Sequence, residues 1–168
     1  MKKIKVIALM GEAGAGKDYL LHEAIDIDKT KPKRALKEII SCTTRPPREG
    51  EKNGVNYYFI TPEEVEKTKE DFLELTTFRD WYYGSRITEL DENLINVGVF
   101  NPDGVRKLLA NDKLEVKVYW VKTPAKERIK RQLDREENPD IEEIFRRYKA
   151  DNEDFSNIDF DYEVIDNG

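Results

Sequence analysis

The stretch IKVIALMGEAGAGKD, from Ile4 to Asp18, decides the fold of this chain. Its first half, Ile4 to Met10, is an apolar run rich in β-branched residues, which is typical of a buried parallel strand. Residues 11–18 fit the phosphate-loop pattern G-x-x-x-x-G-K-[S/T] except at the last position, where Asp18 stands. A helix is expected to begin near Gly16 and to run through KDYLLHEAI. This order of strand, glycine-rich turn and helix predicts a binding site for a phosphate group.

The residue types of this loop have separate physical roles. Glycines let the backbone turn tightly and point its N–H groups inward, and Lys17 would reach the outer phosphates of ATP. Asp18 replaces a hydroxyl that would ligate Mg²⁺, and a carboxylate is also a hard ligand for this ion, so Asp18 is the candidate metal ligand. A glycine-rich turn without a ligand is the weaker alternative, because both flanks match the motif. The expected ATP-binding residues are Gly11, Glu12, Ala13, Gly14, Ala15, Gly16, Lys17 and Asp18.

The composition limits the classes of function. The 168 residues suit one domain, and 29 basic against 35 acidic residues give a net charge of −6. General binders of nucleic acid or anionic membranes are more often basic, so we expect neither as a partner. The single cysteine, Cys42, excludes an internal disulfide, and no segment approaches the roughly 20 apolar residues of a membrane span. The sequence therefore predicts a soluble cytoplasmic protein, either a monomer or a homodimer.

Strands and helices are expected to alternate along the rest of the chain. A polar loop is expected at 28–37, and the predicted strands are 38–44, 55–60, 72–85, 93–100, 114–123 and 160–166. Helix starts are predicted where a capping residue precedes proline, at Thr61–Pro62, Asn101–Pro102, Thr123–Pro124 and Asn138–Pro139. This alternation predicts an α/β fold with a mostly parallel sheet flanked by helices. Residues 41–85 are rich in strands and are expected to form an insertion into that core.

Residues 41–59 contain the most specific motif of the chain. Their sequence, SCTTRPPREGEKNGVNYYF, resembles the guanylate kinase signature S-x-T-T-R-x-P-R-x-G-E followed by G-x-x-Y-x-F. DFLELTTFRDWYYGS, at 71–85, resembles its continuation, and FDYEVIDN, at 160–167, is similar to the closing strand of the family. The resemblance covers most of the chain. It implies one P-loop kinase domain over 1–168, with a core (1–40, 86–123 and 150–168), a nucleoside monophosphate-binding insertion (41–85) and a helical lid (124–149).

The resemblance also implies a reaction, the ATP-dependent transfer of a phosphoryl group to GMP or dGMP. By matching position, it assigns the guanine contacts to Ser41, Glu74 and Ser85. It assigns the acceptor phosphate to Arg45, Arg48, Tyr57 and Tyr83. The chemistry agrees, because one carboxylate can accept both adjacent N–H donors of guanine, and arginines offer planar forks to phosphate. Adenine has no such donor pair and would leave a buried carboxylate unpaired.

In the family, arginines of the helical lid reach the transferring phosphoryl group. The matching positions are Arg131, Arg135 and Arg146, which with Lys17 are the candidate catalytic residues. A charged helix face with pairs such as Glu127–Arg131 is the alternative interpretation of this segment.

The chain departs from the family at the end of one strand. The family usually has D-x-D-x-x-G there, whereas residues 99–104 read VFNPDG, so Val99 and Asn101 occupy the acidic positions. Asn101 can still form hydrogen bonds and Val99 cannot. Two alternatives stay open: a deoxynucleoside monophosphate kinase of other base specificity, and a catalytically silent guanylate-kinase-like binding module. The second is disfavoured because Lys17 and the loop glycines are present.

Overall fold

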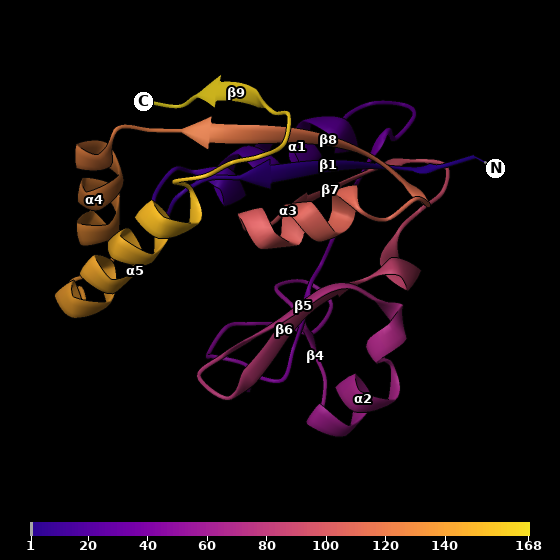
Figure 1. Cartoon of the computed structure of the whole chain (residues 1–168), viewed down its shortest axis with the longest axis horizontal. Coiled ribbons are helices and arrows are strands. Elements are labelled where there is room, and N and C mark those ends of the chain that lie inside the picture. Colours follow the sequence, from indigo (N-terminus) through magenta and orange to yellow (C-terminus); the bar gives the residue numbers. More distant parts are fainter. Residues whose placement is uncertain (1) are drawn as a thin grey trace.

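The computed structural model of this protein describes residues 2–168 and contains a five-stranded parallel sheet (Figure 1). The strand order is β2-β7-β1-β8-β9, and every neighbouring pair is parallel. The strands are β1 (Ile4–Met10), β2 (Leu36–Glu38), β7 (Ile95–Val99), β8 (Leu114–Lys122) and β9 (Glu163–Asp166). The predicted α/β fold with a parallel sheet is therefore confirmed.

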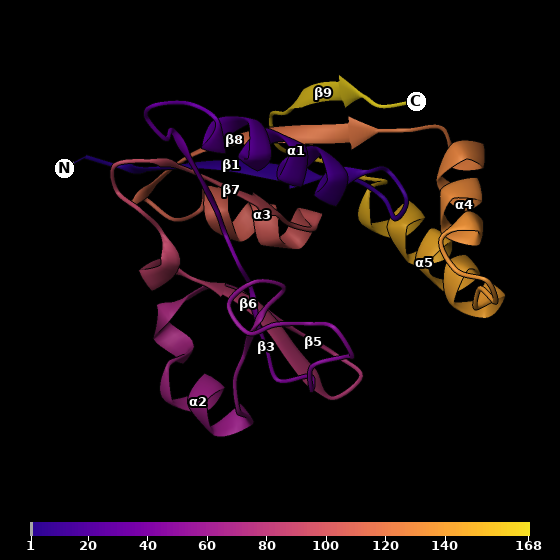
Figure 2. The ribbon, with the colours of Figure 1, turned by 180° about the vertical axis from the view of Figure 1, so that it is seen from behind.

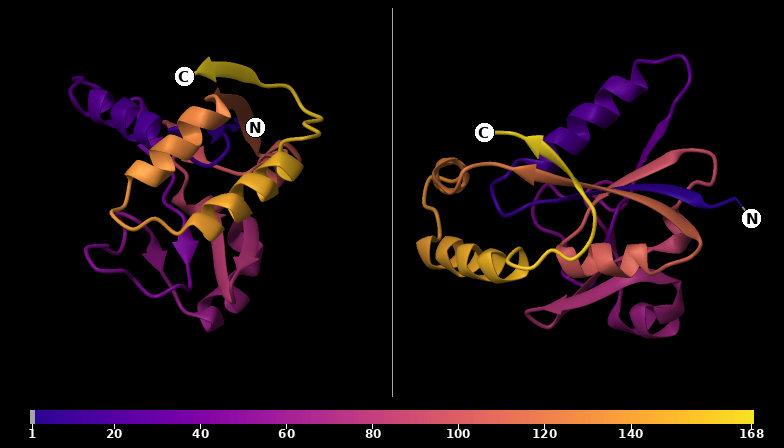
Figure 3. Two further views of the ribbon diagram at one scale, coloured as in Figure 1. Left: turned by 90° about the vertical axis from the view of Figure 1, so that its left-hand side faces the viewer. Right: turned by 45° about the horizontal axis from the view of Figure 1, so that its top comes forward.

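Helices cover both faces of this sheet. The helix α1 (Lys17–Lys29) packs Leu21 and Ile25 against one face, and α3 (Pro102–Leu109) packs Leu108 against the other. Figures 1 and 2 show these two helices on opposite sides of the sheet. Further helices α4 (Ala125–Asp134) and α5 (Ile141–Asp154) lie next to each other beyond the carboxyl ends of β1 and β8 (Figure 3). None of the helices within residues 2–168 has the length and apolarity needed to cross a bilayer.

A second sheet lies below the first in Figure 1, with strand order β4-β3-β6-β5. Its strands are β3 (Cys42–Thr43), β4 (Tyr58–Phe59), β5 (Phe72–Phe78) and β6 (Trp81–Arg86). The helix α2 (Pro62–Lys67) and the short 3₁₀ turns η1 (Lys69–Asp71) and η2 (Ile87–Glu89) complete this part. A long loop, residues 44–57, separates β3 from β4.

Several strand and loop boundaries differ from the prediction. The strand predicted at 55–60 is limited to β4, and the strand predicted at 160–166 is limited to β9. Residues 38–44 do not form one strand, because β2 ends at Glu38 in the parallel sheet and β3 begins at Cys42 in the other sheet. Residues 72–85 form a hairpin rather than one strand, with a turn at Arg79 and Asp80. The predicted loop 28–37 is shorter than expected, because α1 extends to Lys29 and β2 begins at Leu36.

Two of the four predicted helix caps are observed. Thr61 accepts a hydrogen bond from the Glu64 amide, and Asn101 accepts one from the Gly104 amide. The predicted cap at Thr123 is wrong, because its hydroxyl donates to the Ala15 carbonyl instead. The predicted cap at Asn138 is also wrong. The residue that caps α5 is Asp140, which accepts from the Glu143 amide.

The neighbouring leucines of α3 provide a matched test of this packing. Leu108 is 0% exposed in the core, whereas Leu109 is 42% exposed. Leu108→Ala should lower the free energy of unfolding by about 3 kcal/mol, because it leaves a cavity among buried side chains. Leu109→Ala should change it by less than about 0.5 kcal/mol. Urea unfolding followed by circular dichroism measures both, and equal losses would contradict the assigned core face.

Candidate functional site

The glycine-rich loop connects the carboxyl end of β1 to α1 in a conformation that requires glycine. Gly14 and Gly16 have φ of 82° and 93°, in the left-handed region. A Cβ added to Gly14 would lie 2.4 Å from the carbonyl oxygen of Arg128, so no side chain fits there. The Lys17 ammonium donates to the Gly11 and Glu12 carbonyls. Burial lowers the pKa of Lys17, and the nearby carboxylates of Asp18, Asp151 and Glu12 oppose that shift.

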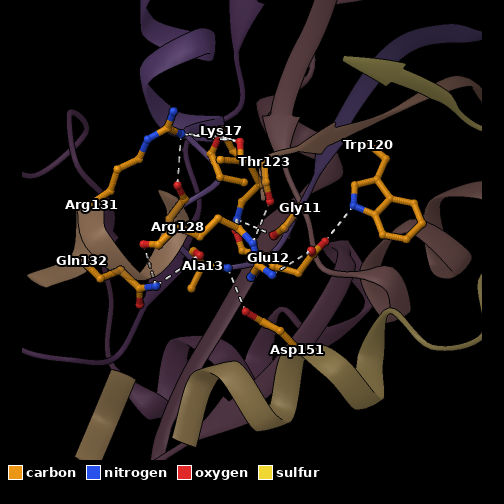
Figure 4. Close-up of polar contacts among 12 residues, drawn as sticks. Gly11, Glu12, Ala13, Lys17, Trp120, Thr123, Arg128, Arg131, Gln132 and Asp151 are labelled. Atoms are coloured by element: carbon orange, nitrogen blue, oxygen red, sulfur yellow. Dashed lines mark hydrogen bonds and ion pairs between the residues drawn. The ribbon is translucent and has the colours of Figure 1, made fainter. Parts of the chain in front are cut away.

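Side chains of α4 and α5 hold the outside of this loop (Figure 4). The Ala13 amide donates to Asp151 Oδ2 at 2.8 Å, and its carbonyl accepts from Gln132 Nε2 at 3.3 Å. Arg131 Nη1 donates to the Gly14 and Ala15 carbonyls, each at 3.3 Å. Sequence reasoning missed Asp151 and Gln132, since neither lies in a motif. The loop is therefore fixed from behind by two helices that follow it in sequence by more than a hundred residues.

The Glu12 side chain joins the same loop to β8. Its Oε1 accepts from Trp120 Nε1 at 2.7 Å, and its Oε2 lies 3.6 Å from Arg128 Nη2 (Figure 4). Arg128 is 6% exposed and donates through Nε to the Thr123 carbonyl. Glu12 and Arg128 therefore support the loop. Lys17 donates to the backbone carbonyl of Glu12, whereas the Glu12 carboxylate accepts from Trp120.

A cavity adjoins the start of α1 and reaches toward the second sheet. It is lined by Lys17 and Asp18 on one side and by Ser41 and Tyr57 on the other. Two strands of the parallel sheet contribute Glu38 and Val99 to its wall. Residues predicted to bind ATP and residues predicted to bind the acceptor therefore line the same cavity.

Glu51 binds the two arginines that are predicted to contact the acceptor phosphate, Arg45 through its side chain and Arg48 through its backbone amide. Arg45 is 5% exposed, and its guanidinium donates to both Glu51 oxygens, at 2.9 and 3.0 Å. Glu51 also accepts from the Arg48 amide at 2.7 Å, while the Arg48 side chain is exposed. Hydrogen bonding by Arg45 lowers the pKa of Glu51. Glu51 is the last residue of the signature that begins at Ser41. Its role could have been predicted from that motif but was not assigned.

The predicted phosphate-binding tyrosines flank Arg45. The Arg45 guanidinium lies 5.4 Å from the ring centroid of Tyr57. The rings of Tyr57 and Tyr83 meet edge to face at 6.2 Å. The structure thus brings Arg45, Tyr57 and Tyr83 into one cluster.

The predicted base-binding residues also lie together. Glu74 of β5 pairs in register with Ser85 of β6, and Ser85 Oγ lies 3.1 Å from Ser41 Oγ. Burial raises the pKa of Glu74, while hydrogen bonding by Ser85 and the charge of Lys107 oppose the shift. The three side chains form a half-buried polar cluster around one carboxylate.

The three predicted lid arginines contact different parts of the molecule. Arg131 contacts the glycine-rich loop, as described above. Arg135 lies exposed at the C-terminal end of α4. Arg146 pairs with Glu143 on α5, at 2.6 Å between Nη2 and Oε1. The structure does not bring these arginines to one point.

The departure at Val99 and Asn101 removes acidic side chains from one wall. Val99 lines the cavity with an apolar side chain, and Asn101 Oδ1 is engaged as the cap of α3, at 2.8 Å from the Gly104 amide. The carboxylates that line the cavity come instead from Asp18, Glu38 and Glu51. His22 Nε2 lies 3.0 Å from Glu38 Oε1 at the same edge.

The donor set fits a metal ion held mainly by a phosphate ligand. Among residues 2–168, no group of three or more His, Cys, Asp or Glu side chains could hold a metal by itself. The carboxylate of Asp18 is exposed in the first turn of α1, next to Lys17. Mg²⁺ at phosphate sites uses one or two carboxylates together with phosphate oxygens and water, and the single carboxylate of Asp18 fits that pattern.

Comparisons with known proteins agree on one family. The guanylate kinase family model matches residues 3–168. Guanylate kinase of Campylobacter jejuni (strain RM1221) is 30% identical over 167 residues, which cover 95% of this chain and 80% of that protein. Guanylate kinase of Fusobacterium nucleatum subsp. nucleatum is 34% identical over 146 residues, which cover 81% of this chain and 72% of that protein.

A solved structure supports the fold. The crystal structure of guanylate kinase from Anaplasma phagocytophilum superposes with a TM-score of 0.60 at 21% identity. The match covers 99% of this chain and 79% of that chain. At this identity the likeness concerns the fold alone.

The raised pKa of Glu74 has a consequence for stability. A folded-state pKa above the ordinary 4.5 means that the ionised carboxyl costs stability as pH rises through that folded value. Glu74→Gln should therefore raise the thermal midpoint at pH 7, on the order of 2 °C. The gain should vanish below pH 4.5, where the carboxyl is protonated in both states. Calorimetry across pH measures this, with exposed Glu70→Gln as the control; a pH-independent difference would contradict the assigned burial.

Proposed function

Since this chain belongs to the guanylate kinase family, we propose that its glycine-rich loop binds ATP and that the adjoining cavity binds the acceptor. The chain is a nucleoside monophosphate kinase that transfers a phosphoryl group from ATP to GMP, giving ADP and GDP. The observation that carries the assignment of the site is the shared cavity, which Lys17 and Asp18 line together with Ser41 and Tyr57. Transfer requires the two phosphates to meet in line within one space.

On the donor side, the loop amides and Lys17 would bind the phosphates of ATP. The loop ends at the start of α1, where the helix dipole favours negative charge. Asp18 would hold Mg²⁺, which neutralises charge on the phosphate oxygens when bound. With the ion bound, the repulsion between the Asp18 carboxylate and the phosphates would be offset.

On the acceptor side, Arg45, Arg48, Tyr57 and Tyr83 would bind the phosphate of GMP. A guanidinium has five N–H bonds. Within residues 2–168, Arg45 directs three of them to the Pro46 carbonyl and the two Glu51 oxygens, which leaves two for a ligand. Glu51 therefore fixes the orientation of Arg45 and leaves donors free for the substrate.

Glu74, Ser41 and Ser85 would select the base. The half-buried Glu74 carboxylate can accept from the adjacent N1–H and N2–H₂ groups of guanine. A base without this donor pair would leave the half-buried Glu74 carboxylate unsatisfied, which is the stronger source of discrimination. Asn101 and Val99 add no acid to this selection.

We assign the chemistry of the transfer to charge stabilisation. Lys17 and the candidate arginines Arg131, Arg135 and Arg146 would neutralise charge on the migrating group. No general base is required, because the acceptor phosphate oxygen is already anionic. In this division of the chain, residues 41–85 bind the acceptor, residues 124–149 form the lid and the remainder is the core. The alternatives, another base specificity or a silent binding module, are not favoured by the family membership.

The acceptor specificity is testable with a panel of nucleoside monophosphates. In a coupled assay of ADP release, GMP or dGMP should give the highest kcat/KM, since only guanine presents both donors to Glu74. Glu74→Gln should raise the KM for GMP by roughly 10- to 100-fold, because it loses a charged acceptor. If AMP or a pyrimidine nucleotide were the best substrate, the role of Glu74 would be wrong.

Lys17 is the second test of the donor site. Lys17→Ala should lower kcat by roughly 100- to 1000-fold, because it removes a fixed positive charge from the phosphates. GMP binding, measured by isothermal titration calorimetry, should stay nearly unchanged. Lys29→Ala, in the last turn of the same helix, is the control and should keep full activity. A Lys17→Ala enzyme as active as the parent would contradict the assignment of the loop.

A further inference from the structure

The turn of the β5–β6 hairpin contains two residues in an unfavourable backbone conformation. Phe78 pairs with Trp81, so the turn consists of Arg79 and Asp80 alone. Their φ values are 50° and 67°, in the left-handed region that favours glycine and asparagine. Arg79 is thus placed where local stability would favour a different residue. An arginine in this conformation motivates a search for contacts of its side chain with the rest of the molecule.

The Arg79 side chain reaches a helix that is distant in sequence. Its Nη2 lies 3.4 Å from Oε2 of Glu143 on α5, 64 residues further along the chain. Glu143 also accepts from Arg146 Nε at 2.8 Å and from Arg147 Nε at 3.1 Å. Hydrogen bonding by Arg146, against the effect of burial, lowers the pKa of Glu143 to about 2. The carboxylate is therefore ionised at any physiological pH and joins the hairpin to α5.

A second contact connects the same two elements. Phe78 is 39% exposed, and the Arg146 guanidinium lies 4.9 Å from the centroid of its ring. Arg79 lies 5.4 Å from the same centroid. Guanidinium groups over an aromatic face are attracted by its negative quadrupole. Arg146 thus contacts Glu143 on its own helix and Phe78 on the hairpin.

These contacts bridge two parts that have separate roles in the proposed function. The hairpin belongs to the sheet that holds Glu74 and Tyr83, whereas α5 holds Asp151 against the glycine-rich loop. Figures 1 and 2 both show the hairpin turn directed toward the side of the molecule where α4 and α5 stand. Phe78 and Arg79 therefore form a direct contact between the acceptor-binding sheet and α5.

We propose that Phe78 and Arg79 form a latch with Glu143 and Arg146 that fixes Arg146 relative to the acceptor-binding sheet. Both hairpin residues are positioning residues, since they act through Arg146 and contact neither the glycine-rich loop nor the base-binding cluster. This inference rests on the proposed function for its effect on catalysis. The contacts are exposed and charged, so they are weak enough to open and close in each cycle.

The turn offers a matched pair of variants. Arg79→Gly relieves the backbone strain and removes the latch, whereas Asp80→Gly relieves strain at the next residue and keeps the latch. Arg79→Gly should raise the KM for GMP and lower kcat/KM by roughly 5-fold at low salt, while its thermal midpoint stays equal to or above that of the parent. Asp80→Gly should keep the parental kinetics. The Arg79→Gly defect should shrink at 1 M salt, where exposed ion pairs are screened, and Arg79→Lys should recover part of the rate.

Measuring the distance between the hairpin and α5 tests the latch independently of enzyme activity. Spin labels at exposed Thr76 on β5 and Lys149 on α5 report the separation of the hairpin and the helix, while buried Cys42 stays unlabelled. Pulsed dipolar spectroscopy should give a narrow distribution in the parent and in Asp80→Gly, and a broader one in Arg79→Gly. If Arg79→Gly matched Asp80→Gly in both kinetics and distances, the latch would be overturned. A parent inactive toward every monophosphate would instead overturn the proposed function, and the distances would still decide the latch.

Discussion

The backbone of Gly14 passes so close to the carbonyl of Arg128 that a methyl group would not fit between them. This approach brings the start of α4 onto the outer side of the glycine-rich loop. Around it, Asp151 and Gln132 bind both polar groups of the Ala13 peptide. These contacts fix the loop backbone before a ligand arrives, which is the condition for electrostatic stabilisation without reorganisation. The strand β1 positions the loop at the carboxyl edge of the sheet, and contacts from α4 and α5 fix its conformation.

The arginines of the site follow the same principle through pairing with acids. Arg45 is held by Glu51, and Arg146 is held by Glu143. The chain has a net charge of −6, yet the substrates ATP and GMP are anionic. Local ion pairs fix the direction of each guanidinium, and Arg45 keeps two N–H groups beyond those that bind Glu51 and Pro46.

Local signals in the sequence were sufficient where the decisive contacts are local. Thr61 and Asn101 cap their helices because the bonded amide lies only three residues away. The cap predicted at Thr123 fails because its hydroxyl binds the Ala15 carbonyl, 108 residues away. The division of residues 38–44 between two sheets depends on partners that no local pattern specifies. In the site, the family motif predicted six residues that lie in two clusters in the structure: Ser41, Arg45, Tyr57, Glu74, Tyr83 and Ser85. Asp151 and Gln132 belong to no motif, and only the packing of α5 and α4 against the loop identifies them.

The two tryptophans lie in different halves of the molecule. Trp120 donates its indole N–H to Glu12 of the glycine-rich loop, while Trp81 stands beside the hairpin turn, opposite Phe78. Indole emission depends on hydrogen bonding and on nearby charge, so each half of the molecule contains its own intrinsic chromophore. Replacing one tryptophan with phenylalanine leaves a spectroscopic reporter for the other half. Nucleotide binding at the loop and movement of the hairpin can then be timed separately in the unlabelled protein.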